Sequence, residues 1–83
     1  MQNIQVKIES FGAIERKLPK DLTLECQASS GIADVFQHIE QLYPDARTLL
    51  ERCACAIGEE IVPRQMLLTH DSTLIILSPV AGG

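Results

Sequence analysis

Apolar and polar residues alternate along two segments near the start of the chain, a period of two that is typical of β-strands with one buried face. The apolar positions of these segments are Ile4, Val6 and Ile8, and then Leu22, Leu24 and Cys26. Residues 11–19 lie between them and contain an early glycine and a late proline, so we expect a connection there. Three apolar residues of this connection are expected to pack inward: Phe11, Ile14 and Leu18. The pattern therefore predicts a β-hairpin.

A helical pattern follows the predicted hairpin. Residues 29–31, Ser-Ser-Gly, offer helix-capping chemistry, and Asp34 lies in the first turn, where the helix dipole favours a negative charge. Apolar residues then recur at steps of three and four and form one helical face: Ile32, Val35, Phe36, Ile39, Leu42 and Tyr43. Pro44 predicts the end of this helix, and residues 45–52 are expected to form a short second helix or a turn.

The second half of the chain predicts a small hairpin and one strongly apolar strand. Residues 53–57 are apolar and precede a polar turn at 58–60, after which residues 61–62 return as a short strand. A turn at 69–71 leads into residues 73–77, the most apolar segment of the chain, which is hydrophobic on both faces. Such a strand is usually central, with one face under a helix and the other covered by loops or offered to a partner.

The order of these elements predicts an α+β domain in which one main helix packs across a mixed sheet, with a short second helix or turn beside it. A chain of 83 residues forms one domain with a modest core. We expect residues 1–78 to make up the folded domain and residues 79–83 to form a flexible tail.

Charge and composition narrow the classes of function. The net charge is -4, and the seven Lys and Arg are dispersed without a basic stripe, so we expect no nucleic-acid partner. An acidic domain instead favours a partner with a positive face. No segment approaches the roughly 18 apolar residues of a membrane span, and the first residues do not resemble a signal peptide. We therefore expect a cytoplasmic protein that binds no membrane.

Few side chains suggest catalysis. The cysteines, Cys26, Cys53 and Cys55, are odd in number and lack zinc-site spacing, so we expect reduced structural thiols, with a redox or sulfur-accepting role as the alternative. The serines have no convincing His-carboxylate arrangement, and there is no phosphate loop. We expect a protein that is not an enzyme by itself and binds no metal or cofactor.

The last two residues, Gly82 and Gly83, are the strongest candidate for function. Because glycine has no Cβ, a terminal Gly-Gly can enter a channel too narrow for other residues. The carboxylate of Gly83 then becomes available to the chemistry of a partner enzyme. The residues expected to present it are Pro79, Val80, Ala81 and Gly82.

Three segments carry a family resemblance. Residues 71–83 run from an aspartate through an apolar strand into Pro-Val-Ala-Gly-Gly, residues 11–16 read Phe-Gly-Ala-Ile-Glu-Arg, and residues 56–62 read Ala-Ile-Gly-Glu-Glu-Ile-Val. Together they resemble the small subunit of molybdopterin synthase and, more generally, the ubiquitin-like β-grasp sulfur carriers. The resemblance covers nearly the whole chain and implies a ubiquitin-like β-grasp fold. Ser78 stands where the molybdopterin subunit often has a proline.

The resemblance also implies a mechanism and its partners. A ubiquitin-activating-type adenylyltransferase would use ATP to adenylate the carboxylate of Gly83, and a sulfur donor protein would convert it into a thiocarboxylate. The large subunit of molybdopterin synthase would then use this sulfur to build the molybdopterin dithiolene from a pterin precursor. One face of the last strand, either Leu74 with Ile76 or Ile75 with Leu77, should meet the partner. Phe11, Ile75 and Leu77 are the candidate interface.

Other functions remain open. The thiamine-pathway sulfur carrier also ends in Gly-Gly but is typically shorter, without the extra turn that residues 45–52 can form, so length favours the molybdopterin branch. The alternatives are a carrier for thiamine or another sulfur pathway, a ubiquitin-like protein modifier, and a plain interaction module.

Overall fold

The computed structural model describes residues 2–79. Its strands are β1 (Asn3–Phe11), β2 (Thr23–Gln27), β3 (Ser30–Gly31), β4 (Ala54–Ile57), β5 (Glu60–Val62), β6 (Leu67–Leu68) and β7 (Ser72–Leu77). Its helices are the 3-10 helix η1 (Gly12–Arg16), α1 (Ile32–Leu42), the 3-10 helix η2 (Pro44–Ala46) and α2 (Arg47–Leu50). None of the helices within residues 2–79 has the length and apolar character needed to cross a membrane.

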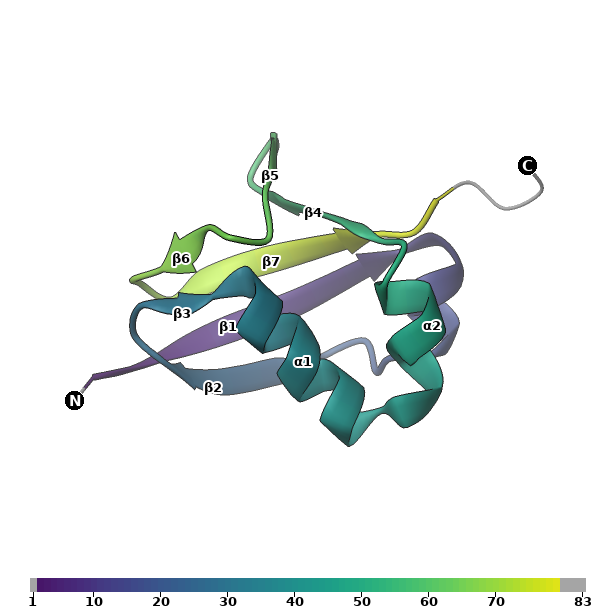
Figure 1. Ribbon diagram of the computed structural model, residues 1–83, viewed down its shortest axis with the longest axis horizontal. Coiled ribbons are helices and arrows are strands. Elements are labelled where there is room, and N and C mark those ends of the chain that lie inside the picture. Colours follow the sequence, from purple (N-terminus) through teal and green to yellow (C-terminus); the bar gives the residue numbers. More distant parts are fainter. Residues whose placement is uncertain (1, 80–83) are drawn as a thin grey trace.

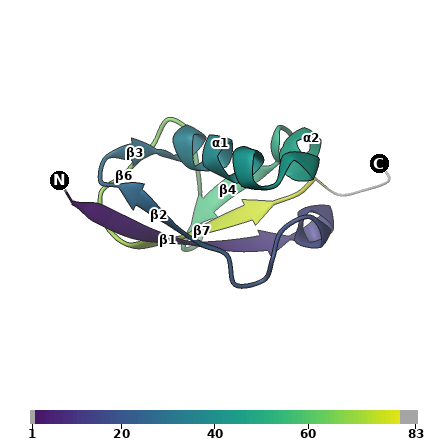
Figure 2. The same cartoon turned by 90° about the horizontal axis from the view of Figure 1, so that it is seen from below.

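The main sheet is mixed and has the strand order β2-β1-β7-β4-β5. The first and last strands, β1 and β7, run parallel at its centre, and the other neighbours are antiparallel. Helix α1 crosses one face of this sheet (Figure 1), and both α-helices lie on that same side (Figure 2). This architecture confirms the predicted α+β fold, with the apolar last strand at a central position.

Alternation of apolar residues places the core between the sheet and α1. In β1 the side chains of Ile4, Val6 and Ile8 are buried, and those between them are exposed. Helix α1 turns one apolar face toward these strands, and its buried residues are Ile32, Val35, Phe36 and Ile39. The helix ends at Leu42, as predicted from Pro44, because proline disfavours helical backbone in the residue before it.

Both predicted hairpins are present. Val6 lies opposite Leu24 in the β1–β2 pair, and Ala56 lies opposite Ile61 in the β4–β5 pair. The predicted short second helix is also present, as η2 followed by α2. Its residues Ala46 and Leu50 are fully buried, so this segment closes one end of the core.

Two apolar residues that were expected to pack inward are instead half exposed. Ile14 and Leu18 are buried as predicted, but Phe11 is 50% exposed because β1 continues through it. The strand's alternation then turns Phe11 away from the helix. Leu42 is also 50% exposed, since it is the last residue of α1 and lies beyond the covered part of its apolar face.

Helix α1 begins directly after the predicted capping segment, residues 29–31. Gly31 is the N-cap, and no serine side chain caps the helix. Instead, the Gly31 N–H donates to the carboxylate of Asp34 at 3.1 Å, while the hydroxyl of Ser30 donates to the carbonyl of Gln27 at 2.6 Å. Ser30 and Gly31 also form β3, which pairs antiparallel with β6. This small second sheet was not predicted, because two-residue strands leave no periodic pattern.

Candidate functional site at the C-terminal strand

Strand β7 presents two different faces. Leu74 and Ile76 are fully buried under α1, whereas Ile75 and Leu77 are half-buried on the opposite, outer face of the sheet. The structure therefore decides between the two pairs considered from the sequence. Ile75 and Leu77 are the pair turned away from the core, and their role in partner binding stays a prediction.

Apolar side chains of neighbouring strands extend this outer face. In the sheet register, Phe11 of β1 and Ala54 of β4 flank Leu77 on its two sides. In the next row, Ile75 lies beside Ala56, which in turn pairs with Ile61. Because laterally paired residues share a face of a sheet, these side chains lie on one face, which we call the outer stripe: Phe11, Ala54, Ala56, Ile61, Ile75 and Leu77. Ala56 is itself buried among its neighbours.

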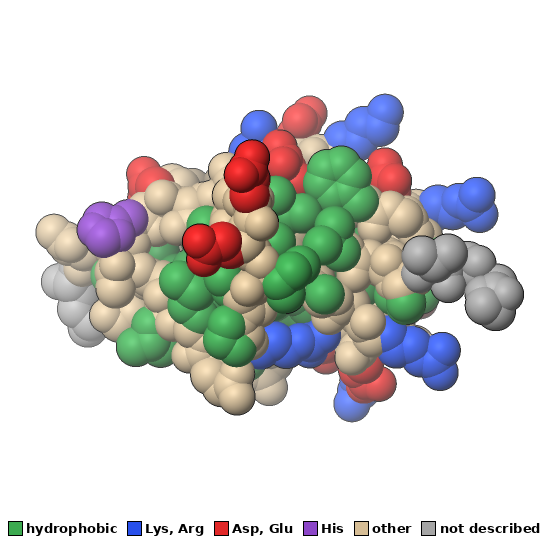
Figure 3. Space-filling model, turned by 90° about the horizontal axis from the view of Figure 1, so that it is seen from above, with side chains coloured by type: hydrophobic (Ala, Val, Ile, Leu, Met, Phe, Trp, Pro, Cys, Tyr) green, Lys and Arg blue, Asp and Glu red, His purple; other side chains and the backbone are tan. Residues whose placement is uncertain are grey.

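The residues at the two edges of the outer stripe are exposed to solvent. Phe11 is 50% exposed and Ile61 is 65% exposed. Figure 3, which views the molecule from above Figure 1, onto the β4–β5 edge of the sheet, shows hydrophobic side chains gathered in the middle of the view with charged side chains around them. Glu9 lies in the same row as Ile75 and adds a negative charge to the border. Contiguous apolar surface with a polar border is typical of protein–protein contacts.

The proposed tail begins where this strand ends. Pro79 is exposed and is the last described residue. The other predicted tail positions, Val80, Ala81, Gly82 and Gly83, lie outside the described residues. Figure 1 shows that β7 and β1 finish at the same end of the sheet, so Ser78, the residue before Pro79, lies beside Phe11 and the outer stripe.

Ser78 holds the start of the tail against η1. Its N–H donates to the carbonyl of Phe11 at 3.0 Å, which adds one bond to the β1–β7 pairing beyond Leu77. Its hydroxyl oxygen accepts the N–H of Ile14 at 2.8 Å. That N–H belongs to the first turn of η1, where backbone donors have no partner within the helix. Ser78 thus caps a helix that lies 64 positions earlier in the chain.

Gly12 makes this approach possible. Its φ is +88°, a backbone conformation that favours glycine. A Cβ on Gly12 would lie 3.0 Å from the Cβ and 3.3 Å from the hydroxyl oxygen of Ser78, tighter than ordinary contact. The glycine after β1 therefore serves both the turn and the packing of Ser78.

The buried thiols near the tail are poor candidates for sulfur chemistry. The sulfur of Cys53 donates to the carbonyl of Leu49 at 3.1 Å, and that of Cys55 donates to the carbonyl of Val62 at 3.2 Å. Burial raises the pKa of both thiols; a hydrogen bond to the hydroxyl of Ser78 and the charge of Arg64 partly oppose this effect at Cys53, and the charge of Arg64 partly opposes it at Cys55. Burial raises the pKa of Cys26 as well. Because the thiolate is the nucleophile, these residues fit structural roles better than the alternative sulfur-accepting role.

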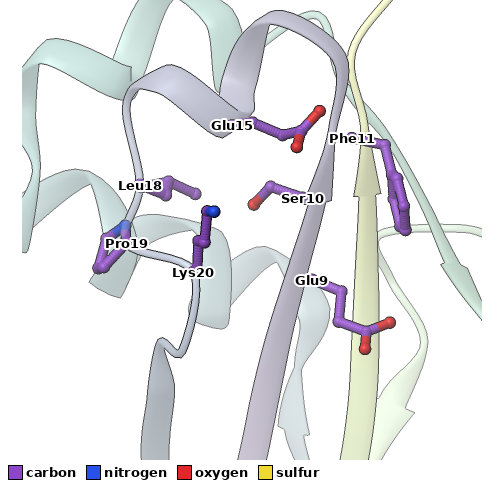
Figure 4. Close-up of a pocket in the computed structure, with 7 residues that line it drawn as sticks. All are labelled: Glu9, Ser10, Phe11, Glu15, Leu18, Pro19 and Lys20. Atoms are coloured by element: carbon purple, nitrogen blue, oxygen red, sulfur yellow. The ribbon is translucent and has the colours of Figure 1, made fainter.

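A cavity of about 220 Å³ lies between the end of β1 and the connection to β2. Figure 4 shows the side chains of Ser10 and Lys20 pointing toward one another within it. The hydroxyl of Ser10 is buried without a hydrogen-bond partner, and the carboxylate of Glu15 accepts the N–H of Gly12 at 3.0 Å. Because the hydroxyl of Ser10 makes no hydrogen bond, neither Lys20 nor Glu15 is in contact with it as a base, and we assign no catalytic role to this cavity.

No metal centre is formed by the part of the chain that the structure describes. Within residues 2–79, no three or more His, Cys, Asp or Glu side chains come together in a way that could hold a metal ion. Within residues 2–79, we take as functional candidates the outer stripe and the root of the tail, by which we mean Ser78 and Pro79.

Sequence reasoning missed several residues of this region. It did not single out Ala54, Ala56 or Ile61 as parts of a surface, although the predicted turn at 58–60 would have placed Ile61 opposite Ala56. It also gave Ser78 no structural role. The glycine directly after β1 was a signal that the backbone turns there, but nothing in the local pattern indicates which distant residue packs against it.

Comparisons with known proteins place these features in a family. The model of the ThiS family matches residues 10–83. No curated protein matches the chain.

Solved structures of similar fold include three of particular interest. A putative molybdopterin converting factor subunit 1 from Pyrococcus furiosus has a TM-score of 0.80 at 14% identity, with 93% of this chain and 99% of that chain covered. Molybdopterin-converting factor from Helicobacter pylori 26695, a protein–protein complex of subunits 1 and 2, gives 0.67 at 20% identity, with 96% and 100% covered. A ubiquitin from Caldiarchaeum subterraneum gives 0.68 at 11% identity, with 99% and 100% covered. These likenesses show a ubiquitin-like β-grasp fold.

Proposed function

Because the chain belongs to the ThiS family, we propose that it is a sulfur carrier whose terminal Gly83 is adenylated and then converted into a thiocarboxylate. We further propose that this sulfur is donated to a pterin precursor to form the dithiolene of molybdopterin. The observation that carries the proposal is that the central strand, the apolar surface and the start of the tail adjoin one another. The central strand β7 has one buried face and one face on the outer stripe, and through Ser78 it is followed by the sequence Pro-Val-Ala-Gly-Gly.

The chemistry requires activation by another protein. A terminal carboxyl group has a reference pKa near 3.5, so at neutral pH the carboxylate of Gly83 is ionised and is a poor electrophile. Attack of this carboxylate on the α-phosphorus of ATP releases pyrophosphate and forms an acyl adenylate. Hydrosulfide, or a sulfur donor protein that supplies its equivalent, then attacks the carbonyl carbon, and AMP leaves. The product is a thiocarboxylate on Gly83, and the carrier itself contributes no acid, base or cofactor.

The geometry of the tail suits this role. Five residues, 79–83, extended at about 3.3 Å each, reach roughly 16 Å, which is enough to enter an active site while the domain stays outside. Pro79 restricts the backbone at the base of the tail. The proposal places the protein in the cytoplasm because adenylation consumes ATP.

We assign the outer stripe to partner recognition. Phe11, Ile75 and Leu77 lie at the end of the sheet from which the tail starts, so a partner that holds the tail would also cover them. The partners proposed are the adenylyltransferase and the large subunit of molybdopterin synthase, which would bind the same surface in turn. The Helicobacter pylori complex of subunits 1 and 2 supports an assembly of this kind.

Intact mass spectrometry tests the chemistry. The protein is incubated with the adenylyltransferase of the same organism, MgATP and sulfide, and we expect the mass to rise by the replacement of one oxygen with sulfur. A variant that lacks Gly82 and Gly83 is the control and should keep its mass. An unchanged mass of the full chain in the presence of an active adenylyltransferase would contradict the proposal.

A ubiquitin-like protein modifier is the second candidate, and the structural likeness to a ubiquitin favours it. The same incubation with added cell extract separates the two, because a modifier would become attached to lysines of other proteins. Co-purification with a pterin-binding large subunit would separate a molybdopterin carrier from a carrier for thiamine or another sulfur pathway.

A further inference from the structure

We propose that Ser78 is the positioning residue of the C-terminal tail, fixing the point at which residues 79–83 leave the domain. This inference rests on the proposed function of Gly83 and names the residue that sets its reach. Ser78 is the last residue before the proline that begins the tail.

Ser78 is held through two of its own groups. Its N–H donates to Phe11 at the end of β1, and its hydroxyl accepts from Ile14 in η1. The two contacts approach from different elements, so together they restrict both translation and rotation of the backbone at this residue. A proline in its place would have neither an N–H nor a hydroxyl.

The residues that hold Ser78 are themselves firmly placed. The side chain of Ile14 is fully buried, which anchors η1 in the core, and Phe11 is the last residue paired in the β1–β7 ladder. Gly12 lies between them, and a Cβ there would approach the Cβ of Ser78 to 3.0 Å and force a shift. Ser78 is therefore connected to the core through the buried Ile14 and the paired Phe11.

This arrangement has a consequence for the reaction. If Ser78 were released, the last fixed backbone position would be Leu77, and Gly83 would lie six residues from it instead of five. A partner docked on the outer stripe would then find Gly83 distributed over a larger volume, and the reacting carbon would be oriented less often. Loss of orientation lowers kcat, whereas KM depends chiefly on docking of the unchanged surface.

The test compares two serines on the same strand. Ser78→Ala removes the acceptor for Ile14, and the matched control Ser72→Ala removes a hydroxyl that donates to the carbonyl of His70 at 2.7 Å, at the opposite end of β7. ATP-pyrophosphate exchange by the adenylyltransferase gives kcat and KM for each carrier. We expect Ser78→Ala to lower kcat about threefold to tenfold with KM nearly unchanged, the scale of one hydrogen bond of typical net strength. Ser72→Ala should match the wild type.

Amide hydrogen exchange supplies a readout that does not depend on any enzyme. Exchange at the N–H of Ile14 should accelerate in Ser78→Ala and not in Ser72→Ala. Ser78→Thr, which keeps the hydroxyl, should restore both the protection of Ile14 and kcat.

The outcomes separate this inference from the proposed function. If the wild type is adenylated and Ser78→Ala has the same kcat and the same Ile14 protection as Ser72→Ala, the positioning role is wrong while the carrier function stands. If the wild type is not adenylated at all, the proposed function fails, and with it the assignment of Ser78 to that reaction.

Discussion

The side chain of Arg64 contacts three residues from two helices and the segment before β4: Leu50, Cys53 and Phe36. Its guanidinium donates to the carbonyls of Leu50 and Cys53, the latter at 2.9 Å, and lies 4.3 Å from the centre of the Phe36 ring. It thereby joins the end of α2 to the buried face of α1. The planar guanidinium can stack and donate at the same time, which a lysine ammonium cannot reproduce.

We expect Arg64→Met to destabilise the domain by about 1–3 kcal/mol, because it keeps the apolar stem and removes the donors to two carbonyls. Urea unfolding followed by circular dichroism measures the change. Arg47→Met is the matched control, since the guanidinium of Arg47 makes only surface ion pairs, at 3.8 Å to Glu40 and 3.7 Å to Glu51, with its side chain 70% exposed. Such pairs contribute about 0–1 kcal/mol. Equal losses in the two variants would contradict the role given to Arg64.

At the scale of elements, β7 combines a structural face and a proposed recognition face in six residues. Leu74 and Ile76 pack under α1, while Ile75 and Leu77 belong to the outer stripe. The two functions of the strand can therefore be separated by changing adjacent positions.

We expect Ile76→Lys to unfold the protein, because an unpaired charge in a fully buried position costs more than the roughly 5 kcal/mol by which so small a domain is stable. Ile75→Lys should fold, since the ammonium can reach solvent from the outer face. It should weaken binding to the partner subunit, as measured by calorimetric titration. Wild-type affinity of a folded Ile75→Lys variant would remove the outer stripe from the interface.

The individual helices and strands of this fold could be predicted from the sequence, but which strands lie next to one another in the sheet could not. The alternation at Ile4, Val6 and Ile8 indicates a strand and its buried face, and Pro44 indicates the end of α1, because these signals are local. Which strands pair is not a local property. The parallel contact of β1 with β7 joins residues far apart in the chain, and so does the bond between Ile14 and Ser78, which are 64 positions apart.

At the candidate site, too, the sequence alone could not decide which apolar side chains are exposed. Phe11 was expected both to pack inward and to belong to an interface, and only the length of β1 decides that it is exposed. Ile75 and Leu77 could not be chosen over Leu74 and Ile76, because the strand is apolar on both faces. The structure shows that Leu74 and Ile76 are the pair that packs under α1.

At the scale of the whole molecule, the residues that stabilise the fold are distinct from the residue that is proposed to react. The buried side chains lie between the sheet and α1, and the last fixed backbone contact of the chain within residues 2–79 is the bond from Ser78 to Phe11. The proposed reaction takes place five residues further on, at Gly83. A change at the terminus should therefore affect the reaction and leave the fold alone.

One alanine added after Gly83 tests this separation. The carboxyl carbon would move by up to about 3.6 Å and would be carried on a residue with a Cβ. Since a misplacement of about 1 Å can cost a hundredfold in rate, we expect thiocarboxylate formation to fall at least about a hundredfold, as followed by intact mass. The midpoint of thermal unfolding should stay at the wild-type value. An alanine added before Met1 is the control for chain extension and should change neither quantity. If the C-terminally extended protein acquires sulfur at the wild-type rate, the terminal carboxylate is not held in a narrow channel, and the reason for a Gly-Gly ending must be sought elsewhere.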